Sequence, residues 1–261
     1  MISHNIFNDI FIIPILNLLV VFYKIFLSVH LPYAFGLAIV ALTVSIRILL
    51  HPFFKQQIDT AKKMQDLKPQ LDALTAKYKK DAKKLQQEQI RMYQEAGINP
   101  AAGCLFLIIQ IPVFIGLYRT LSLFFAKGGI KAAVISINKV LYVPALKITT
   151  IDLNFFGFNL ASTPSKLGGI ALLIPFITAF LQYLQVQFAS PQMPKEDKTK
   201  LAVKDKKEDT SSDFQKTMNT QMKYIFPLMI GYFSFSFPVG LSLYWNIFSV
   251  ISIIQYRRVK S

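Results

Sequence analysis

The sequence predicts an all-α integral membrane protein, with five transmembrane helices around a hydrophilic groove, a cytoplasmic helical hairpin and an N-terminal helix in the membrane interface. The first observation is composition: of 261 residues, 53% are hydrophobic and only 16% are charged, whereas soluble domains carry about 25% charged residues. The second is a set of apolar stretches that approach the roughly 20 residues needed to cross a bilayer. The third is an excess of 29 Lys and Arg over 14 Asp and Glu, which in an apolar chain is typical of cytoplasmic loops.

After the N-terminal segment, three apolar stretches are each assigned to one span, and the last stretch is assigned to two. Residues Tyr224–Tyr256 carry no charge, but as one helix they would be about 50 Å long, too long for a single crossing. Pro238 and Gly240 favour a turn, so we expect two short helices in a membrane hairpin, which implies a locally thinned bilayer. The expected spans are about 33–54, 101–124, 167–189, 222–237 and 240–256, within a core at 31–256.

The loops between the spans set the expected orientation. The segments 55–99 and 190–223, with the short basic tail 257–261, hold 21 Lys and Arg, against five in 125–166. The positive-inside rule therefore places both segments and the C-terminus in the cytoplasm. Residues 190–221 have no apolar face, so we expect a flexible loop there.

The segment 55–99 is expected to form two antiparallel helical arms. Its second arm, Ala82–Ala96, begins after a candidate N-cap, Asp81, and ends at Gly97, a good C-cap. Pro69 predicts a kink in the first arm. The alternative to a helical hairpin over 55–99 is a solvated linker. The first arm has an apolar residue every third or fourth position, as in a coiled-coil seam: Met64, Leu67, Leu71, Leu74 and Tyr78.

The N-terminal residues 1–30 allow three interpretations. Asp9, Asn17, Lys24 and Ser28 fall within an arc of about 100° on a helical wheel, and a narrow polar stripe favours a helix lying in the membrane interface. An extra span is the second interpretation. A signal sequence is the third, although residues 1–9 lack Lys and Arg.

Arg47 is the candidate functional residue, because a charge within a span costs at least a few kcal/mol. Snorkelling of its guanidinium to the headgroups is the alternative. Three spans carry polar stripes at helical spacing, which suggests a shared wet cavity, and no acidic residue lies in a span, so this cavity would attract an anion. The stripes are Thr43, Arg47 and His51; Thr178, Gln182 and Gln185; and Ser242, Trp245, Ser249 and Ser252.

Several motifs in order resemble the YidC family of membrane protein insertases, in a short form without the large periplasmic domain. The resemblance covers about Tyr33 to Tyr256, and rests on these stretches: Thr43–Pro52, Ala61–Pro69, Gln89–Tyr93, Gly97–Cys104, Gln110–Tyr118, Met222–Pro227 and Phe237–Trp245. It implies a multi-pass protein of the bacterial plasma (inner) membrane. Its groove would be open to cytoplasm and lipid, with Arg47, Thr43, Gln182 and Trp245 in it. The polar stripes add Gln185 and Ser242 to these groove residues.

The function that the resemblance implies is insertion and chaperoning of membrane proteins. The groove would receive the hydrophilic tail of a nascent membrane protein, whose apolar segment then passes into lipid, and the cytoplasmic hairpin would recruit substrates. Expected partners are nascent membrane proteins, the Sec translocon, the ribosome and the phospholipid bilayer, with no specific nucleic-acid sequence. No enzymatic activity, cofactor or metal is expected, since Cys104 is the single cysteine and the three histidines are scattered. The alternative is a channel or transporter with a positively charged cavity.

Overall fold

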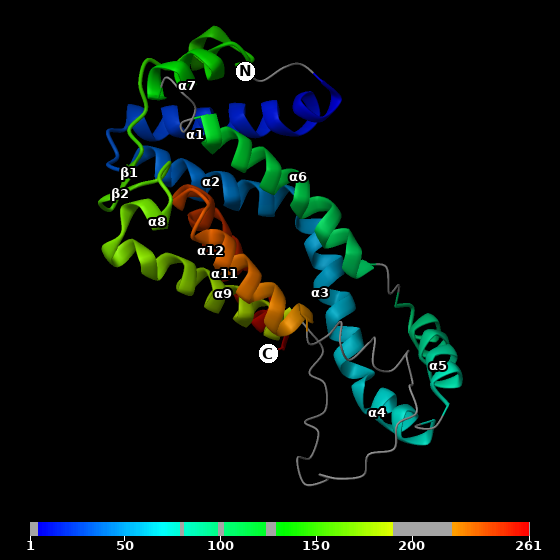
Figure 1. The fold of residues 1–261 in the computed structure, drawn as a ribbon. Coiled ribbons are helices and arrows are strands. Elements are labelled where there is room, and N and C mark those ends of the chain that lie inside the picture. The colour runs from blue at the N-terminus through cyan, green and yellow to red at the C-terminus, as the bar shows by residue number, and fades with distance from the viewer. Residues whose placement is uncertain (1–4, 79–80, 99–101, 124–128, 190–220, 261) are drawn as a thin grey trace.

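The computed structural model describes residues 5–78, 81–98, 102–123, 129–189 and 221–260, and these are mostly helical (Figure 1). By length and composition, three described helical segments can cross a membrane: Asn8–Ser28, Gly169–Phe188 and Val239–Arg258. A bent pair, Ala34–Leu49 with His51–Asp66, would supply a fourth. The prediction of an all-α membrane protein is confirmed, with one two-stranded hairpin added.

The elements run in chain order from the N-terminal helix to the C-terminal helix. The first half contains η1 Asn8–Ile12, α1 Ile13–Ser28, α2 Ala34–Leu49, α3 His51–Asp66, α4 Lys68–Lys77, α5 Ala82–Glu95 and α6 Ala102–Ser122. The second half contains α7 Gly129–Asn138, η3 Pro144–Leu146, β1 Asn154–Phe155, β2 Phe158–Asn159, α8 Pro164–Leu167, η4 Gly169–Leu172, α9 Leu173–Ala189, η5 Gln221–Ile225, α11 Phe226–Ser234 and α12 Val239–Lys260.

A sharp bend separates α2 from α3, where the sequence suggested one span over 33–54. The helix axes differ by 69°, and Leu50 lies between them. Pro52 is the second residue of α3; it has no N–H to donate and its ring clashes with the carbonyl of the residue four earlier. The bend turns the chain away from the bundle and starts the arm made of α3, α4 and α5.

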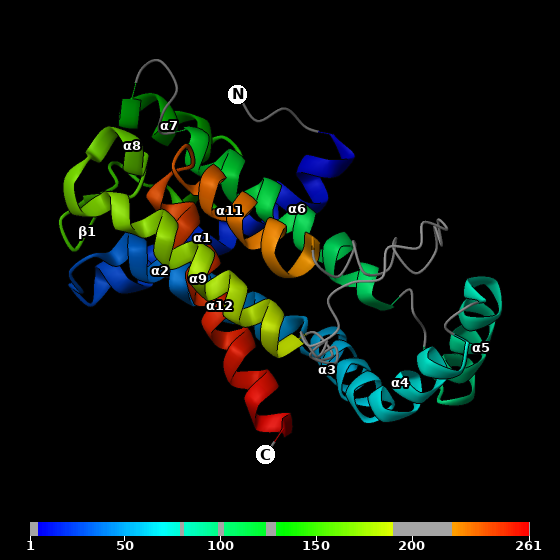
Figure 2. The same ribbon diagram turned by 60° about the horizontal axis from the view of Figure 1, so that its bottom comes forward.

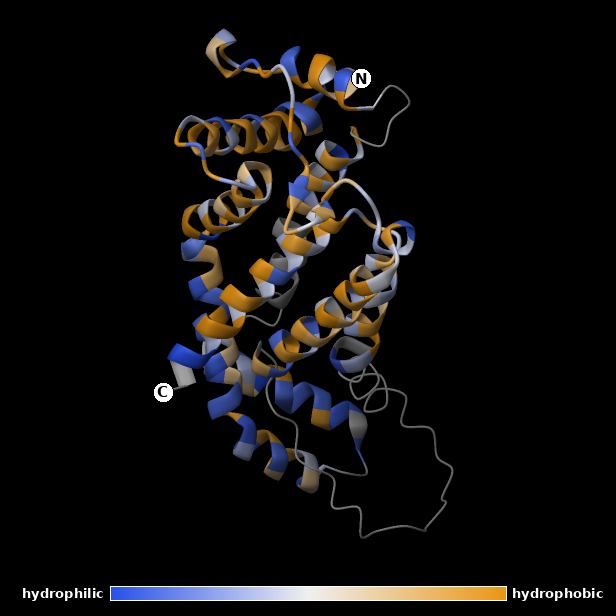
Figure 3. Cartoon of the chain, turned by 90° about the vertical axis from the view of Figure 1, so that its left-hand side faces the viewer, coloured by the Kyte–Doolittle hydropathy of each residue, from blue (hydrophilic) through white to orange (hydrophobic). Residues whose placement is uncertain are grey.

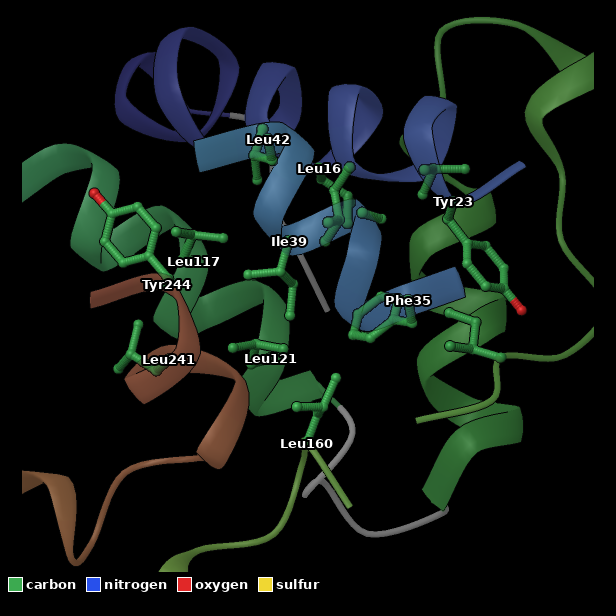
Figure 4. Close-up of a cluster of buried hydrophobic side chains, with 14 of the residues drawn as sticks. Leu16, Tyr23, Phe35, Ile39, Leu42, Leu117, Leu121, Leu160, Leu241 and Tyr244 are labelled. Carbon is green, nitrogen blue, oxygen red and sulfur yellow. The ribbon is translucent and has the colours of Figure 1, made fainter. Parts of the chain in front are cut away.

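The apolar core lies where α1, α2, α6 and the start of α12 meet (Figure 4). Leu16, Ile39, Leu117 and Leu241 are at most 1% exposed. Gly240 allows the close approach of α12, because a Cβ there would lie 3.2 Å from Ile39, from Leu121 and from the Leu160 carbonyl. This packing holds α12 against α2, on which the candidate site depends.

The last two helices are separated by residues 235–238, close to the expected turn. Together η5 and α11 span 221–234, and α12 begins at Val239, directly after Pro238. The first N–H groups of α12 are capped from another segment: Val239 N donates to Ser162 O at 2.9 Å, and Gly240 N to Leu160 O at 2.8 Å. Since α12 continues to Lys260, most of the basic tail is helical. The expected loop at 190–220 lies outside the described residues.

The segment expected to be a helical hairpin forms helices α3, α4 and α5, and α4 and α5 stand apart from the bundle in both views (Figures 1 and 2). The first arm breaks at Leu67, and Pro69 falls in the first turn of α4, where proline is tolerated. Asp81 caps α5 by accepting from Lys84 N at 3.0 Å. Polar residues dominate this arm and apolar residues the bundle (Figure 3). The seam residues Met64, Leu67, Leu71, Leu74 and Tyr78 are all half-buried.

The polar stripe of the N-terminal helix binds protein backbone. Asn17 is 3% exposed; its Nδ2 donates to Val140 O at 3.0 Å, and its Oδ1 accepts from Tyr142 N at 2.8 Å. Lys24 Nζ donates to Ala145 O at 2.6 Å. The stripe therefore docks the segment after α7, a partner that the helical wheel could not reveal.

Candidate functional site

Arg47 is 5% exposed and is covered by aromatic rings instead of reaching into solvent. The centre of its guanidinium lies 4.1 Å from the Phe54 ring centroid and 4.2 Å from that of Phe248. Stacking of this kind offsets part of the cost of removing a cation from water. The two ring centroids are 5.9 Å apart and their planes meet at 65°, so the rings cover the guanidinium from two directions roughly at right angles, and its N–H donors need polar partners.

The edge of the guanidinium is only partly satisfied. One terminal nitrogen, Nη2, donates to Ser252 Oγ and to Phe248 O, the latter at 3.4 Å. The buried Nε has no hydrogen-bond partner among the described residues. An unmet donor of a buried cation is expensive, so this edge is a place for water or for an anionic group.

Local sequence explains why these groups meet. The bend at Leu50 and Pro52 places Phe54, in the first turn of α3, back over the last turn of α2. On α12, Phe248 and Ser252 are four residues apart and therefore share one helix face. Tyr244 precedes them at the same spacing and is 1% exposed.

A second polar group joins α9 to α12. Gln182 Oε1 accepts from Trp245 Nε1 at 2.7 Å and from Ser249 Oγ at 3.3 Å. The indole of Trp245 also packs edge-on against Phe114 of α6, with centroids 5.3 Å apart. Ser249 and Ser252 are one turn apart on α12, so the Gln182 group and the Arg47 group lie beside each other along this helix.

The remaining stripe hydroxyls are satisfied locally. Thr43 Oγ1 donates to Ile39 O at 2.7 Å and Thr178 Oγ1 to Ile174 O at 2.9 Å, the usual back-bond of a helical threonine. Ser242 and Ser234 pair through their hydroxyls at 2.7 Å. These residues border the site with hydroxyls that already hydrogen-bond within the bundle, and His51 is exposed.

Amide oxygens on α9 and α12 are the other unmet groups. Gln185 is 6% exposed, and its Oε1 has no partner among the described residues. The same holds for oxygens of Gln187, Asn246 and Gln255. The helical stripes pointed to Gln185 but missed Asn246 and Gln255, although these are visible as amides within an apolar run. Such groups are costly in a dry interior.

The site carries net positive charge: Asp59 and Asp66 of α3, the helix that supplies Phe54, are both exposed, and the bundle helices around Arg47 have no acidic residue. The sequences of α2, α9, α11 and α12 contain no Asp or Glu. Within the part of the chain that the structure describes, no group of three or more His, Cys, Asp or Glu could hold a metal ion. Attraction of an anionic group to the edge of Arg47 is the chemistry that this arrangement supports.

Comparison with known proteins identifies the family. Residues 25–261 match the model of the 60Kd inner membrane protein family. The membrane protein insertase YidC of Oceanobacillus iheyensis is 29% identical, over 98% of this chain and 85% of that protein. YidC of Alkalihalophilus pseudofirmus is 30% identical, over 85% of this chain and 71% of that protein. The chain belongs to the YidC family.

Chloroplast members of the YidC family also match. ALBINO3-like protein 1 of Arabidopsis thaliana is 34% identical over 87% of this chain. The chain spans about half the length of such chloroplast relatives, 43% of this one. The family match begins at residue 25, so η1 and most of α1 lie outside it, whereas both polar groups lie inside.

Proposed function

We propose that this chain is a membrane protein insertase whose groove, lined by Arg47, Thr43, Gln182, Gln185, Trp245 and Ser242, receives the hydrophilic tail of a nascent membrane protein. The observation that carries the proposal is the buried edge of Arg47, where Nε lacks a partner and the bundle helices α2, α9, α11 and α12 contain no acidic residue. An acidic tail supplies the missing counter-charge. The names of the YidC relatives support insertion and do not favour a channel or transporter.

Five spans would surround this groove: α2 with the start of α3, α6, α9, η5 with α11, and α12. Helix α6 has 21 residues, enough for a crossing. The basic segments 55–99 and 190–221, with the C-terminus, would face the cytoplasm. This orientation opens the site toward the side on which new chains are made, because Arg47 lies in the last turn of α2.

The N-terminal helix would lie along the outer membrane interface, although it is long enough to span. Its polar stripe holds the irregular segment 139–147, in which Tyr142, Val143 and Lys147 are exposed. Irregular backbone and a lysine exposed to lipid hydrocarbon are strongly unfavourable. A position in the interface would let both the irregular backbone and the lysine contact headgroups and water.

The hairpin formed by the end of α3, α4 and α5 would recruit substrates through the apolar seam of its first arm. The seam residues are Met64, Leu67, Leu71, Leu74 and Tyr78. No residue of α4 is fully buried, which suits a surface that partners can reach. The Sec translocon and the ribosome are proposed partners on this side. We propose no catalytic chemistry, because insertion needs hydration, attraction and release, all of which side chains of this site can provide.

Insertion into vesicles tests the proposal. The purified protein is reconstituted in lipid vesicles, and a single-span protein with a short acidic tail is translated in their presence. We expect a protease-protected tail in these vesicles, several-fold less with Arg47→Ala, and no loss with Arg258→Ala, an exposed arginine of the C-terminal turn. Equal protection in vesicles that lack the protein would contradict insertase function.

A further inference from the structure

A small β-hairpin presents an aromatic tip at one end of the bundle. Strands β1 and β2 pair antiparallel through Asn154 with Asn159 and Phe155 with Phe158. The turn residues Phe156 and Gly157 have φ of +48° and +86°, as in the tight turns that favour Asn-Gly. Gly157 N donates to Asn154 Oδ1 at 3.1 Å. A bulky phenylalanine is therefore held where the backbone favours a small residue, which suggests a use for its side chain.

The two adjacent phenylalanines point in different directions. Phe155 lies against Gly36 of α2, where a methyl group would overlap its ring. Phe156 is 68% exposed, and its ring stacks on Tyr33 with centroids 4.7 Å apart and planes at 26°. Phe155 thus fixes the hairpin to α2, while Phe156 and Tyr33 form an outward aromatic pair.

This pair lies at the level where the spans begin. Tyr33 directly precedes α2, and the hairpin lies beside α8 at the end of the bundle where α2 and α9 start (Figures 1 and 2). The chain just after β2 caps the start of α12 through Leu160 O and Ser162 O. The end of α1 and the turn before α2 add three exposed apolar residues, Leu27, Val29 and Leu31. The hairpin and the residues before it add three exposed polar residues, Asp152, Asn154 and Asn159.

We propose that this aromatic tip, Phe156 stacked on Tyr33, inserts into the outer-leaflet headgroup region and fixes the depth of α2 in the bilayer. Aromatic rings concentrate at this level of membranes, and the ends of the spans define that level here. Arg47 follows Tyr33 by 14 residues, or about 21 Å along a helix. In a core of about 30 Å, the tip would hold Arg47 in the cytoplasmic half of the bilayer. The inference rests on α2 crossing the bilayer and not on the substrate groove.

Spin labels test the position of the tip. In a Cys104→Ser background, single cysteines replace Phe156 or, as the control, Asp152, and the labelled protein is reconstituted in phosphatidylethanolamine–phosphatidylglycerol vesicles. We expect the label at 156 to collide more with oxygen than with a water-soluble nickel complex, and the label at 152 to show the reverse. Equal access of the nickel complex to both labels would overturn the proposal.

A second label tests whether the tip sets the depth. Ile48, one residue beyond Arg47, is 69% exposed and carries the label, while Phe156 is changed to Asp or to Trp. Phe156→Asp should let α2 shift outward and move the label toward the bilayer centre by about 1.5 Å or more, one residue's rise; Phe156→Trp should leave it in place. An unchanged depth in both variants would contradict the anchoring role. Neither readout depends on insertion activity, so the proposed function can fail independently.

Discussion

The guanidinium of Arg47 lies 4.1 Å from the centre of the Phe54 ring, although the two residues belong to helices bent by 69°. Only two side chains of α3 are fully buried, Phe54 and Ile58. The buried charge of the bundle is therefore also a docking point for the base of the arm formed by α3, α4 and α5. A group that binds Arg47 changes the surroundings of the residue that holds this arm in place.

Replacing Phe54 with leucine should loosen α3 while leaving α9 and α12 intact. Stacking of arginine on an aromatic ring contributes about 0.5–2 kcal/mol, so opening of α3 should become several-fold more frequent. Hydrogen exchange of the reconstituted protein measures this, and Phe54→Tyr, which keeps the ring, is the control. Unchanged exchange in α3 would mean that Ile58 and the α2 connection suffice.

Arg47→Ala should reduce insertion of an acidic-tailed substrate several-fold, and Arg47→Lys should reduce it less. Lysine keeps the charge and can also lie over an aromatic ring, but it lacks the planar fork of donors. A substrate whose tail Asp and Glu are changed to Asn and Gln should be less sensitive to both variants. If Arg47→Ala inserted the acidic substrate at the normal rate, the electrostatic role would be wrong.

Asn17→Ala should destabilise the protein by about 1–3 kcal/mol, the usual cost of leaving buried polar partners unsatisfied. The change removes bonds to Val140 O and Tyr142 N. Thermal unfolding in detergent measures the effect. Ser28→Ala, which loses only an exposed bond within its own helix, should stay within about 0.5 kcal/mol; an equal loss in both variants would refute the docking role of Asn17.

Deleting α4 and α5, with a Gly-Ser linker joining Leu67 to Ala96, should leave a folded bundle but impair insertion. The structure puts these limits after α3, because Phe54 and Ile58 pack on the bundle, whereas α4 buries no residue fully. Membrane fractionation and thermal unfolding report the fold, and the vesicle assay reports insertion. Loss of the protein from the membrane would indicate that the hairpin is structural.

Periodicity and composition were enough to predict the helical membrane bundle, the turn near Pro238 and the position of Arg47 within the bundle. They could not predict the partners of Arg47, because Phe54 and Phe248 are apolar residues in apolar surroundings and only the bend brings them together. The partner of the α1 stripe could not be predicted for the opposite reason: its polar pattern is the same whether Asn17 faces headgroups or backbone. Stripe spacing also could not show that the hydroxyls of Thr43 and Thr178 bond their own helices.

Labelling of single cysteines tests the proposed groove most directly, because it shows whether water reaches the site from the cytoplasmic side alone. Single cysteines replace Gln185 or Asn246, whose amide oxygens lack partners, in a Cys104→Ser background; Ala38→Cys, at a fully buried position, is the control. A membrane-impermeant thiol reagent should label positions 185 and 246 in inside-out vesicles, spare them in right-side-out vesicles, and leave position 38 unlabelled in both. Labelling of 185 and 246 from both sides would indicate a pore, and labelling from neither would indicate a dry bundle; either result would contradict the proposed groove.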